Sequence, residues 1–554
     1  MLAHTNVKHG GEMSDLTMNQ GAADVHAPRP HLESKPHPFG ALAFLLVLLS
    51  GLAYAAYSVS SDISNVGEHS LAVGAFVLLG VALVIALGFE FVNGFHDTAN
   101  AVATVIYTHS MPPLAAVIWS GTFNFLGVLT SSGAVAFTVV TLLPVELILQ
   151  VGSGAGYAMI FSLLIAAIIW NLGTWAMGLP NSSSHALIGS IMGVGLANQL
   201  LAPAGSATSG VDWGQAVGVR KALLFSPLIG FVLAALLLLL MKFVVRSPSL
   251  YSAPEGKKPP PPAIRALLVL TCTGVSFFHG SNDGQKGMGL IMLILIGAAP
   301  TAYALNRAIP ESTTPAFLEA TQGAQNVFQT HSSGSTLPAN AAAARSIVGD
   351  ALKSKDVNKP EVYAALAVLT ADIESQVKNY GAIKAVPAAA TSNVRNDMYL
   401  ASDAVRIMGA SPAGFDDADV TKLKSLRSSL DSGTKFIPTW VKITVALALG
   451  LGTMVGWKRI VVTVGEKIGK THLTYAQGAS AEIVAMATIG LADVYGLPVS
   501  TTHVLSSGVA GAMAANGSGL QWGTIKNMAL AWVMTLPAAM VIAGSLYVLL
   551  RQVF

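Results

Sequence analysis

Two short segments place small hydroxyl side chains and a histidine directly after a Gly-Leu-Pro turn in an otherwise apolar chain: residues 178–185 and residues 496–503. Glycine and proline break helices, and backbone groups freed within a bilayer must find partners or line a polar cavity. A half-helix beginning at each turn would aim free N–H groups and its positive dipole end inward. With the neighbouring hydroxyl groups, such tips suit a tetrahedral oxyanion. The predicted anion-binding residues are Ser182, Ser183, Ser184, Ser500, Thr501 and Thr502.

The alternative for these hydroxyl groups is that they only cap the half-helices. A single such segment would support the capping and the anion-binding interpretations equally. Two segments at matched positions favour a binding site, and the two tips together would form a cage of donors without a fixed positive charge.

Two aspartates, Asp97 and Asp283, lie within apolar runs. Intramembrane carboxylates are costly and usually functional, so we predict that they bind a coupling cation or accept the hydrogen of a protonated phosphate. Sulfate lacks that hydrogen and would leave the acceptor unpaired. Lys286, one turn after Asp283, could neutralise it or meet the anion, and an ion pair at a membrane boundary is the alternative. The amides expected beside these carboxylates are Asn93, Asn100 and Asn282.

Further polar residues in the candidate spans could carry protons. Glu90 and Glu482 are proton-site candidates, against a role in hydrogen bonds between helices. Histidine titrates near neutral pH, although a lone buried histidine is more often a satisfied hydrogen-bonding residue. Asn124 and Asn171 are expected to join helices. The histidine candidates are His96, His185, His279 and His503.

The composition requires a bilayer as the solvent. Of 554 residues, 53% are hydrophobic and 11% are charged, and the mean hydropathy is +0.59, whereas soluble domains carry about 25% charged residues. The net charge of +3 gives no sign of a nucleic-acid partner, and the single cysteine, Cys272, excludes an intrachain disulfide. No motif predicts a cofactor or a resident metal. The polar residues 1–38 fit a retained first span better than a cleaved signal peptide.

The apolar runs predict an all-α polytopic membrane protein with about 10–12 membrane segments, since a spanning helix needs about 20 apolar residues. Two runs, 71–106 and 264–299, would each make a helix of ~54 Å against a core of ~30 Å. Each must form two spans, or one crossing that is tilted and broken. The candidate spans are 39–59, 71–106, 114–143, 157–180, 186–201, 222–243, 264–299, 438–456, 475–497, 503–516 and 524–550.

Basic loops set the predicted orientation. Residues 243–265 and 457–474 are rich in Lys and Arg, so both should be cytoplasmic. An even number of crossings then lies between them, and 264–299 should cross once. The segment 301–436 is therefore expected outside as a soluble insertion, and the N-terminus is expected inside.

The chain also resembles itself. Gly94 to Asp97 and Gly280 to Asp283 share a Gly-x-x-Asp pattern, and the two Gly-Leu-Pro segments align. The spacing between the two features differs by 132 residues between the halves, and the long insertion accounts for 129 of them. The halves would start on opposite sides, which predicts an inverted-topology repeat. Many secondary transporters have this design, with the site at the repeat interface, although channels and enzymes can also be duplicated.

These patterns divide the chain into a tail, an extra helix and two repeats. The predicted parts are a polar tail at 1–38, an extra transmembrane helix at 39–59, repeat A at 60–243, a cytoplasmic linker at 244–263, the start of repeat B at 264–300, the insertion at 301–436, and the rest of repeat B at 437–554.

Three stretches, 94–101, 279–287 and 498–503, resemble the signatures of the inorganic phosphate transporter (Pit) family. The resemblance covers about 71–300 and 438–550. It implies phosphate uptake across the bacterial inner membrane by a multi-pass protein. Bacterial members are taken to be H⁺ symporters that can carry neutral metal–phosphate complexes, while others couple to Na⁺. The family's Asn-Asp motif maps onto 96–97 and 282–283, and its Ser-x-Thr-His hairpin onto 500–503 and 182–185.

One departure from the family pattern bears on the coupling ion. His96 stands where Asn is commoner, which weakens a symmetric sodium site and favours protons. The expected partners are phosphate, H⁺ or Na⁺, the lipid bilayer and a divalent metal carried with phosphate; a homo-oligomer is left open. A sulfate permease or an anion channel is the alternative. An intramembrane hydrolase is disfavoured because no Gly-x-Ser-x-Gly elbow is present.

Overall fold

The structure, a computed structural model, is helical throughout its described part. The N-terminal tail predicted at 1–38 lies almost wholly outside the described residues, so its place is not assigned. The only β-type pairing among the described residues is one isolated bridge between Gly469 and Leu520. The described residues are 30, 32, 38–66, 73–97, 99–149, 151–203, 211, 213–254, 256, 258–410 and 414–554.

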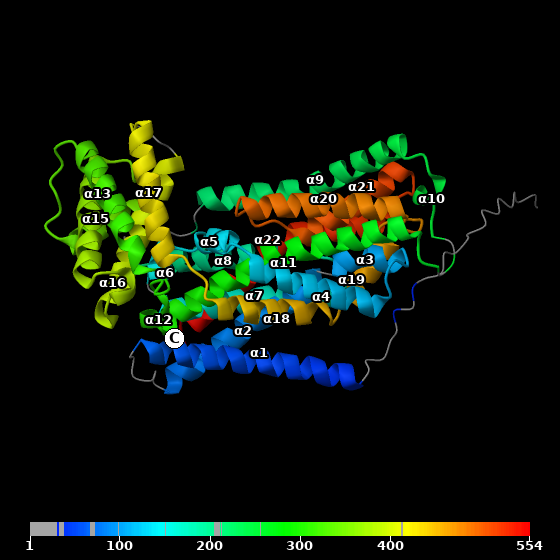
Figure 1. The fold of residues 1–554 in the computed structure, drawn as a ribbon, viewed down its shortest axis with the longest axis horizontal. Helices are drawn as coiled ribbons and strands as arrows, with labels where there is room; N and C mark the ends of the chain where they lie inside the picture. Colours follow the sequence, from blue (N-terminus) through cyan, green and yellow to red (C-terminus); the bar gives the residue numbers. More distant parts are fainter. Residues whose placement is uncertain are drawn as a thin grey trace, which may run out of the picture.

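The helices fall into a long bundle and a smaller helical group at one end of it (Figure 1). The bundle comprises α1 (Pro38–Asn65), α2 (Val73–Asp97), α3 (Ala99–Tyr107), α4 (Pro113–Thr130), α5 (Ala134–Val140), α6 (Val145–Leu149), α7 (Gly154–Ala176), α8 (Ser183–Leu200), α9 (Trp213–Val244), α10 (Pro248–Tyr251), α11 (Pro262–Ala298), α12 (Pro300–Tyr303), α18 (Thr439–Thr453), α19 (Lys458–Val462), η3 (Thr463–Lys467), α20 (Tyr475–Val494), α21 (Thr501–Asn516) and α22 (Trp522–Leu550). The smaller group comprises η1 (Glu311–Thr313), α13 (Thr314–His331), α14 (Ala341–Ser354), α15 (Pro360–Tyr380), η2 (Ile383–Ala385), α16 (Ala388–Ala410) and α17 (Asp417–Thr434).

Helices of the two halves exchange partners in the bundle. Helix α4 of the first half packs on α11 of the second, while α18 of the second packs on α2 of the first. Likewise α8 packs on α22, and α21 packs on α9. A duplicated unit joined face to face gives this reciprocal pattern. The inverted orientation of the two halves stays a prediction.

The two long apolar runs behave differently. The first is described as α2 and α3 on either side of residue 98, which lies outside the described residues, so a break in this crossing stays a prediction. For the second run, the predicted break is wrong: α11 continues without interruption for 37 residues from Pro262 to Ala298. It therefore reaches from one end of the bundle to the other as one crossing, which the loop charges required. Its glycines allow close packing instead of breaking the helix, because a Cβ on Gly280 would lie 2.2 Å from the Asn124 carbonyl oxygen.

The described residues contain seven helices long and apolar enough to cross a membrane, or eight if the bent pair α17 and α18 counts as one span. The helices α8, α20 and α21 fall outside that count because they are short or carry many polar side chains. The run 114–143 is also two helices, α4 and α5, separated by Gly133 at φ +88°. The prediction of 10–12 membrane segments includes these polar and short helices.

The helices α13 to α17 enclose an apolar core of their own. They lie at the end of the bundle opposite α10 (Figure 1). The group contacts the bundle through buried Arg395, whose guanidinium donates to the Ile148 carbonyl at 3.2 Å. The segment between α11 and α18 is therefore a compact helical unit, whose role the sequence does not indicate.

The close helix contacts give a test of the packing. Gly127→Ala and Gly280→Ala should each lower the unfolding temperature, because their Cβ atoms would lie 2.0 Å from the Phe277 carbonyl oxygen and 2.2 Å from that of Asn124. Overpacking of this kind costs about 1–3 kcal/mol. Thermal unfolding of the detergent-solubilised protein measures the effect. Gly88→Ala is the matched control, since nothing lies within 4 Å of its added Cβ; an equal loss in that variant would contradict the packing argument.

The orientation of the bundle can be tested with single cysteines in a chain whose buried Cys272 is replaced. Thr336→Cys, exposed in the smaller helical group, should react with a membrane-impermeant maleimide in intact cells. Ser249→Cys, exposed in α10 at the opposite end, should react only after lysis. Labelling in the reverse order would overturn the orientation predicted from the basic loops.

Candidate functional site

Each Gly-Leu-Pro turn is followed by a helix that begins inside the protein. The hydroxyl of Ser182 accepts a hydrogen bond from the His185 backbone N–H at 3.2 Å, at the start of α8. Ser500 accepts from the His503 N–H at 3.1 Å, at the start of α21. Both half-helices were predicted. These two serines make the capping bonds of the alternative interpretation, and their part in anion binding stays a prediction.

The next hydroxyl groups of both half-helices meet at one carboxylate. Ser183 donates to Oδ2 of Asp97 at 2.7 Å, and Thr502 donates to Oδ1 of the same residue at 3.0 Å. The Asp97 side chain also lies 2.9 Å from Nδ1 of His96. A negative charge at two helix N-termini is favourable. The two tips therefore converge, and in this conformation they hold Asp97 where they could hold an anion.

The remaining two hydroxyl groups differ in their surroundings. Ser184 donates to the Val499 carbonyl at 2.9 Å and accepts from the ammonium of Lys286. Thr501 is buried, and its hydroxyl has no hydrogen-bond partner among the described residues. Thr501 is thus the predicted anion-binding residue whose hydroxyl has a hydrogen bond left to make.

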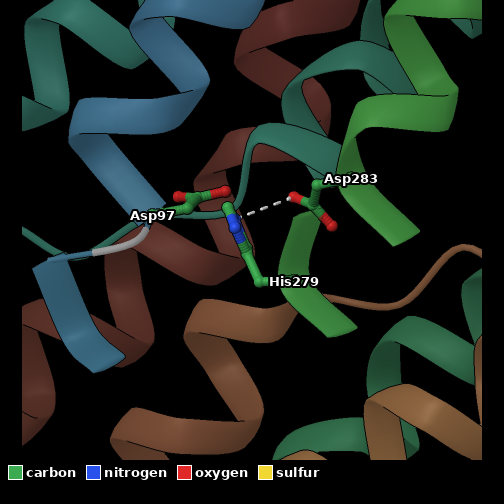
Figure 2. Close-up of side chains that lie close together, drawn as sticks. All are labelled: Asp97, His279 and Asp283. Carbon is green, nitrogen blue, oxygen red and sulfur yellow. Dashed lines mark ion pairs between the residues drawn. The ribbon is translucent and has the colours of Figure 1, made fainter. Parts of the chain in front are cut away.

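The two aspartates approach each other with His279 between them, as Figure 2 shows. One ligand atom from each of these three side chains lies within 4.8 Å of the others. Nε2 of His279 lies 3.6 Å from Asp283, and Nζ of Lys286 lies 2.6 Å from it. The exposed fractions of Asp97 and Asp283 are 4% and 0%. Because two carboxylates this close cannot both ionise cheaply without compensation, the histidine and the lysine are part of the site.

The two predicted amides whose side chains are described, Asn93 and Asn282, bond to groups other than the two aspartates. Asn93 donates to Glu90 at 3.4 Å, and Asn282 donates to the Leu497 carbonyl at 3.1 Å. The side chain of Asn100 lies outside the described residues. One oxygen of Glu90 is buried and has no hydrogen-bond partner in the described part of the chain. Glu90 therefore stays a proton-site candidate. Its carboxylate lies against α11, since a Cβ added to Gly287 would be 2.1 Å from Oε1 of Glu90.

The structure separates Glu482 from this cluster and brings two predicted histidines together. Glu482 accepts a hydrogen bond from Thr271 of α11, and Thr271 precedes Asp283 by twelve residues, or about 18 Å along a helix. The rings of His185 and His503 contact each other in a tilted arrangement with centroids 4.5 Å apart, and His503 also packs on Trp532. Glu482 is thus distant from the aspartates, whereas the histidine pair adjoins the site, since His185 directly follows Ser184, which bonds Lys286.

Several residues join this site that sequence reasoning missed or placed elsewhere. Asp493 accepts from Ser281 at 2.6 Å and from Gln285 at 2.7 Å. It lies in a candidate span, so the criterion that selected Asp97 could have selected it too. Asn124 was expected to join helices and does so: its amide contacts Nδ1 of His279 at 2.8 Å and donates to Thr453 at 3.2 Å.

A cation could be held by the oxygen of each aspartate and a nitrogen of His279. Hard cations prefer oxygen ligands, while imidazole suits transition metals and Zn²⁺. Lys286 competes for Asp283, so a bound metal ion would have to displace the ammonium or share the carboxylate with it. Protonation of Asp283 would likewise oppose its ion pair with Lys286, whereas Asp97 is bonded to two hydroxyl groups and to His96.

The fold and site define a multi-pass, all-helical membrane protein with a buried charged centre where two half-helices meet. A sequence profile described as "Phosphate transporter family" matches residues 93–543, and the chain belongs to this family.

Curated relatives of similar length are also phosphate transporters by name. "Low-affinity inorganic phosphate transporter PitA" of Escherichia coli K12 is 42% identical over 86% of this chain and 97% of its own. PitB of the same strain is 41% identical over 86% and 98%, and the "Low-affinity inorganic phosphate transporter" of Buchnera aphidicola from Acyrthosiphon pisum is 40% identical over 87% and 96%. A solved structure, "The sodium-dependent phosphate transporter", aligns with 86% of this chain at 19% identity and a TM-score of 0.47, too distant a likeness to support an argument.

The convergence of the tips predicts how hydroxyl deletions act. Ser183→Ala and Thr501→Ala should each weaken apparent phosphate affinity, since each removes a hydrogen-bond donor that a bound anion would use, and a hydrogen bond to a charged group is worth roughly 1.5–3 kcal/mol. The apparent KM of phosphate uptake measures this change, with protein levels near normal. Ser190→Ala is the matched control, because that hydroxyl only bonds the Ala186 carbonyl of its own helix. Unchanged affinity in both site variants would favour a purely structural role.

Proposed function

We propose that this protein imports inorganic phosphate across the bacterial inner membrane by cation symport, with H⁺ as the coupling ion. The observation that carries the proposal is the single carboxylate, Asp97, at which Ser183 and Thr502 of two separate half-helices meet. Family membership supports phosphate as the substrate. Transport of an unchanged ion, and not a chemical conversion, is the activity proposed.

The coupling step follows from the bonds of Asp97. While its carboxylate is ionised, it occupies the Ser183 and Thr502 hydroxyl groups and repels an anion. When a proton neutralises Asp97, those donors become available to phosphate and the repulsion ends. Binding of the proton and of the anion is then positively coupled, and the coupling is reciprocal.

Asp283 and Lys286 supply the second half of the proposed site. Their ion pair at 2.6 Å has no net charge, so it does not itself expel an anion. If Asp283 is protonated, the ammonium of Lys286 is free to meet phosphate. An ionised Asp283 can accept the hydrogen of a protonated phosphate instead, which sulfate cannot supply. This acceptor is the feature that favours phosphate over a sulfate permease.

Other coupling ions use the same three side chains. Asp97, His279 and Asp283 could contact a divalent metal that enters as a neutral metal–phosphate complex. A sodium ion would need mainly oxygen ligands, and His279 and His96 place nitrogen atoms beside both carboxylates. This donor set favours the proton over sodium.

Removal of either carboxylate charge should separate binding from coupling. Asp97→Asn and Asp283→Asn should abolish gradient-driven phosphate accumulation, because neither amide can take up the coupling proton. Both should retain phosphate–phosphate exchange, since Asn carries no charge to repel the anion. The measurement compares uphill uptake with exchange in the same proteoliposomes, with proton and sodium gradients imposed separately.

Asp62→Asn is the matched control, because this aspartate of α1 accepts from Tyr303 and Trp440 away from the half-helix tips. It should accumulate phosphate like the parent. Accumulation at the parent's level in both site variants would remove the aspartates from coupling, and Glu90, Glu482 or the histidines would take their place. Accumulation by the parent under a sodium gradient alone would identify Na⁺ as the coupling ion.

A further inference from the structure

A cavity of about 460 Å³ lies where the smaller helical group joins the bundle. Its walls come from α5, from α16 and α17, and from the turn that precedes the second half-helix, at Tyr495 and Gly496. The cavity is thus on the same end of the bundle as the segment 301–436 (Figure 1). Its cationic lining residues are Arg406, Arg427 and Lys435.

Positive charge exceeds negative charge in this cavity. One carboxylate, Asp431, faces both Lys435 at 2.8 Å and Arg427 at 3.6 Å, and it also accepts from Ser402. Arg406 pairs with Asp403 at 2.6 Å. Asp431 therefore cannot balance both of its cations. Nε of Arg427 is buried and has no hydrogen-bond partner among the described residues, because Asp431 lies 3.6 Å away, so the two charges are only loosely paired.

A further cation lies beside the cavity floor. The ammonium of Lys442, in α18, donates to the Ser131 carbonyl at 2.7 Å, and the next residue, Ser132, lines the cavity. This lysine makes no salt bridge within 4.0 Å in the described part of the chain. The positive potential thus extends from the smaller helical group into the bundle.

Hydrogen bonds connect the start of α5, beside the cavity, with α11 and α20. The Val135 N–H, at the start of α5, donates to Gln285 at 2.9 Å, and Gln285 donates to Asp493 at 2.7 Å. Gln285 follows Asp283 by two residues on α11. This glutamine therefore links the segment beside the cavity to the helix that carries Asp283, although its hydrogen bonds with Val135, Ser281 and Asp493 involve neither aspartate of the proposed site.

We propose that this cavity is an outer collection site for a hydrated tetrahedral oxyanion, phosphate in particular, formed jointly by the smaller helical group and the bundle. This proposal rests on the proposed function and on the predicted outward orientation of residues 301–436. A cleft lined by one sign of charge raises the local concentration of the opposite ion and the rate at which it enters. The half-exposed arginine and the hydroxyl groups of the walls suit weak binding followed by transfer inward.

The test measures phosphate uptake into intact cells at low and high ionic strength. Arg427→Gln and Lys435→Gln should each raise KM by about threefold or more at low ionic strength, with Vmax unchanged, because electrostatic attraction is lost. Asp431→Asn removes the opposing charge and should lower KM. All three differences should shrink at high salt, where exposed charges are screened. Arg427→Lys should retain most of the parent's affinity.

Lys422→Gln is the control of equal charge change, since Lys422 lies beside Gly323 of α13 and does not line the cavity. It should leave KM unchanged. The proposal is overturned if Arg427→Gln and Asp431→Asn both leave KM at the parent's value, or if Lys422→Gln raises it equally. A fall in Vmax at constant KM would show a structural effect and count against the proposal too. Failure of the parent to take up phosphate would instead overturn the proposed function.

Discussion

A buried carboxylate that must be satisfied away from water governs the centre of this protein. Asp97 receives hydrogen bonds from Ser183 and Thr502, which belong to separate half-helices, and it contacts His96. A carboxylate in a low-dielectric interior is stable only with such partners. The N-termini of the two half-helices therefore have to meet at the same point. The Gly-Leu-Pro turns, the capping serines and the exchange of helices between the halves bring them there.

Close backbone contact is the second requirement of this arrangement. Helices α4, α11, α2 and α18 pack around the site through glycines whose Cβ atoms would meet carbonyl oxygens of a neighbour, as at Gly94, Gly127, Gly280 and Gly452. Side chains of ordinary size there would move the helices apart. The aspartates would then lose the arrangement in which one ligand atom each of Asp97, His279 and Asp283 lies within 4.8 Å of the others. Small residues in the Gly-x-x-Asp segments thus position the charged residues that follow.

The sequence was sufficient to predict the half-helices, the pairing of the aspartates and the single crossing of α11, because these follow from turn residues, matched spacing and loop charge. The unbroken course of α11 was not predictable. Its glycines signal a break and a close contact equally well, and only the neighbouring Asn124 carbonyl decides between them. The partners of the hydroxyl groups were also hidden. Which hydroxyl caps a helix, which bonds Asp97 and which has no partner depends on helix rotation, which spacing does not fix.

The same reasoning explains why Asp493 and Gln285 were missed. Neither belongs to a repeated motif, and each acquires its place only when α20 packs on α11. Gln285 accepts a hydrogen bond from the Val135 N–H at the start of α5 and donates one to Asp493. Ser281, one turn before Gln285 on α11, also donates to Asp493. A shift of α5 relative to α20 would have to break these bonds. The polar side chains of Ser281, Gln285 and Asp493 therefore tie α5, α11 and α20 together on this side of the bundle.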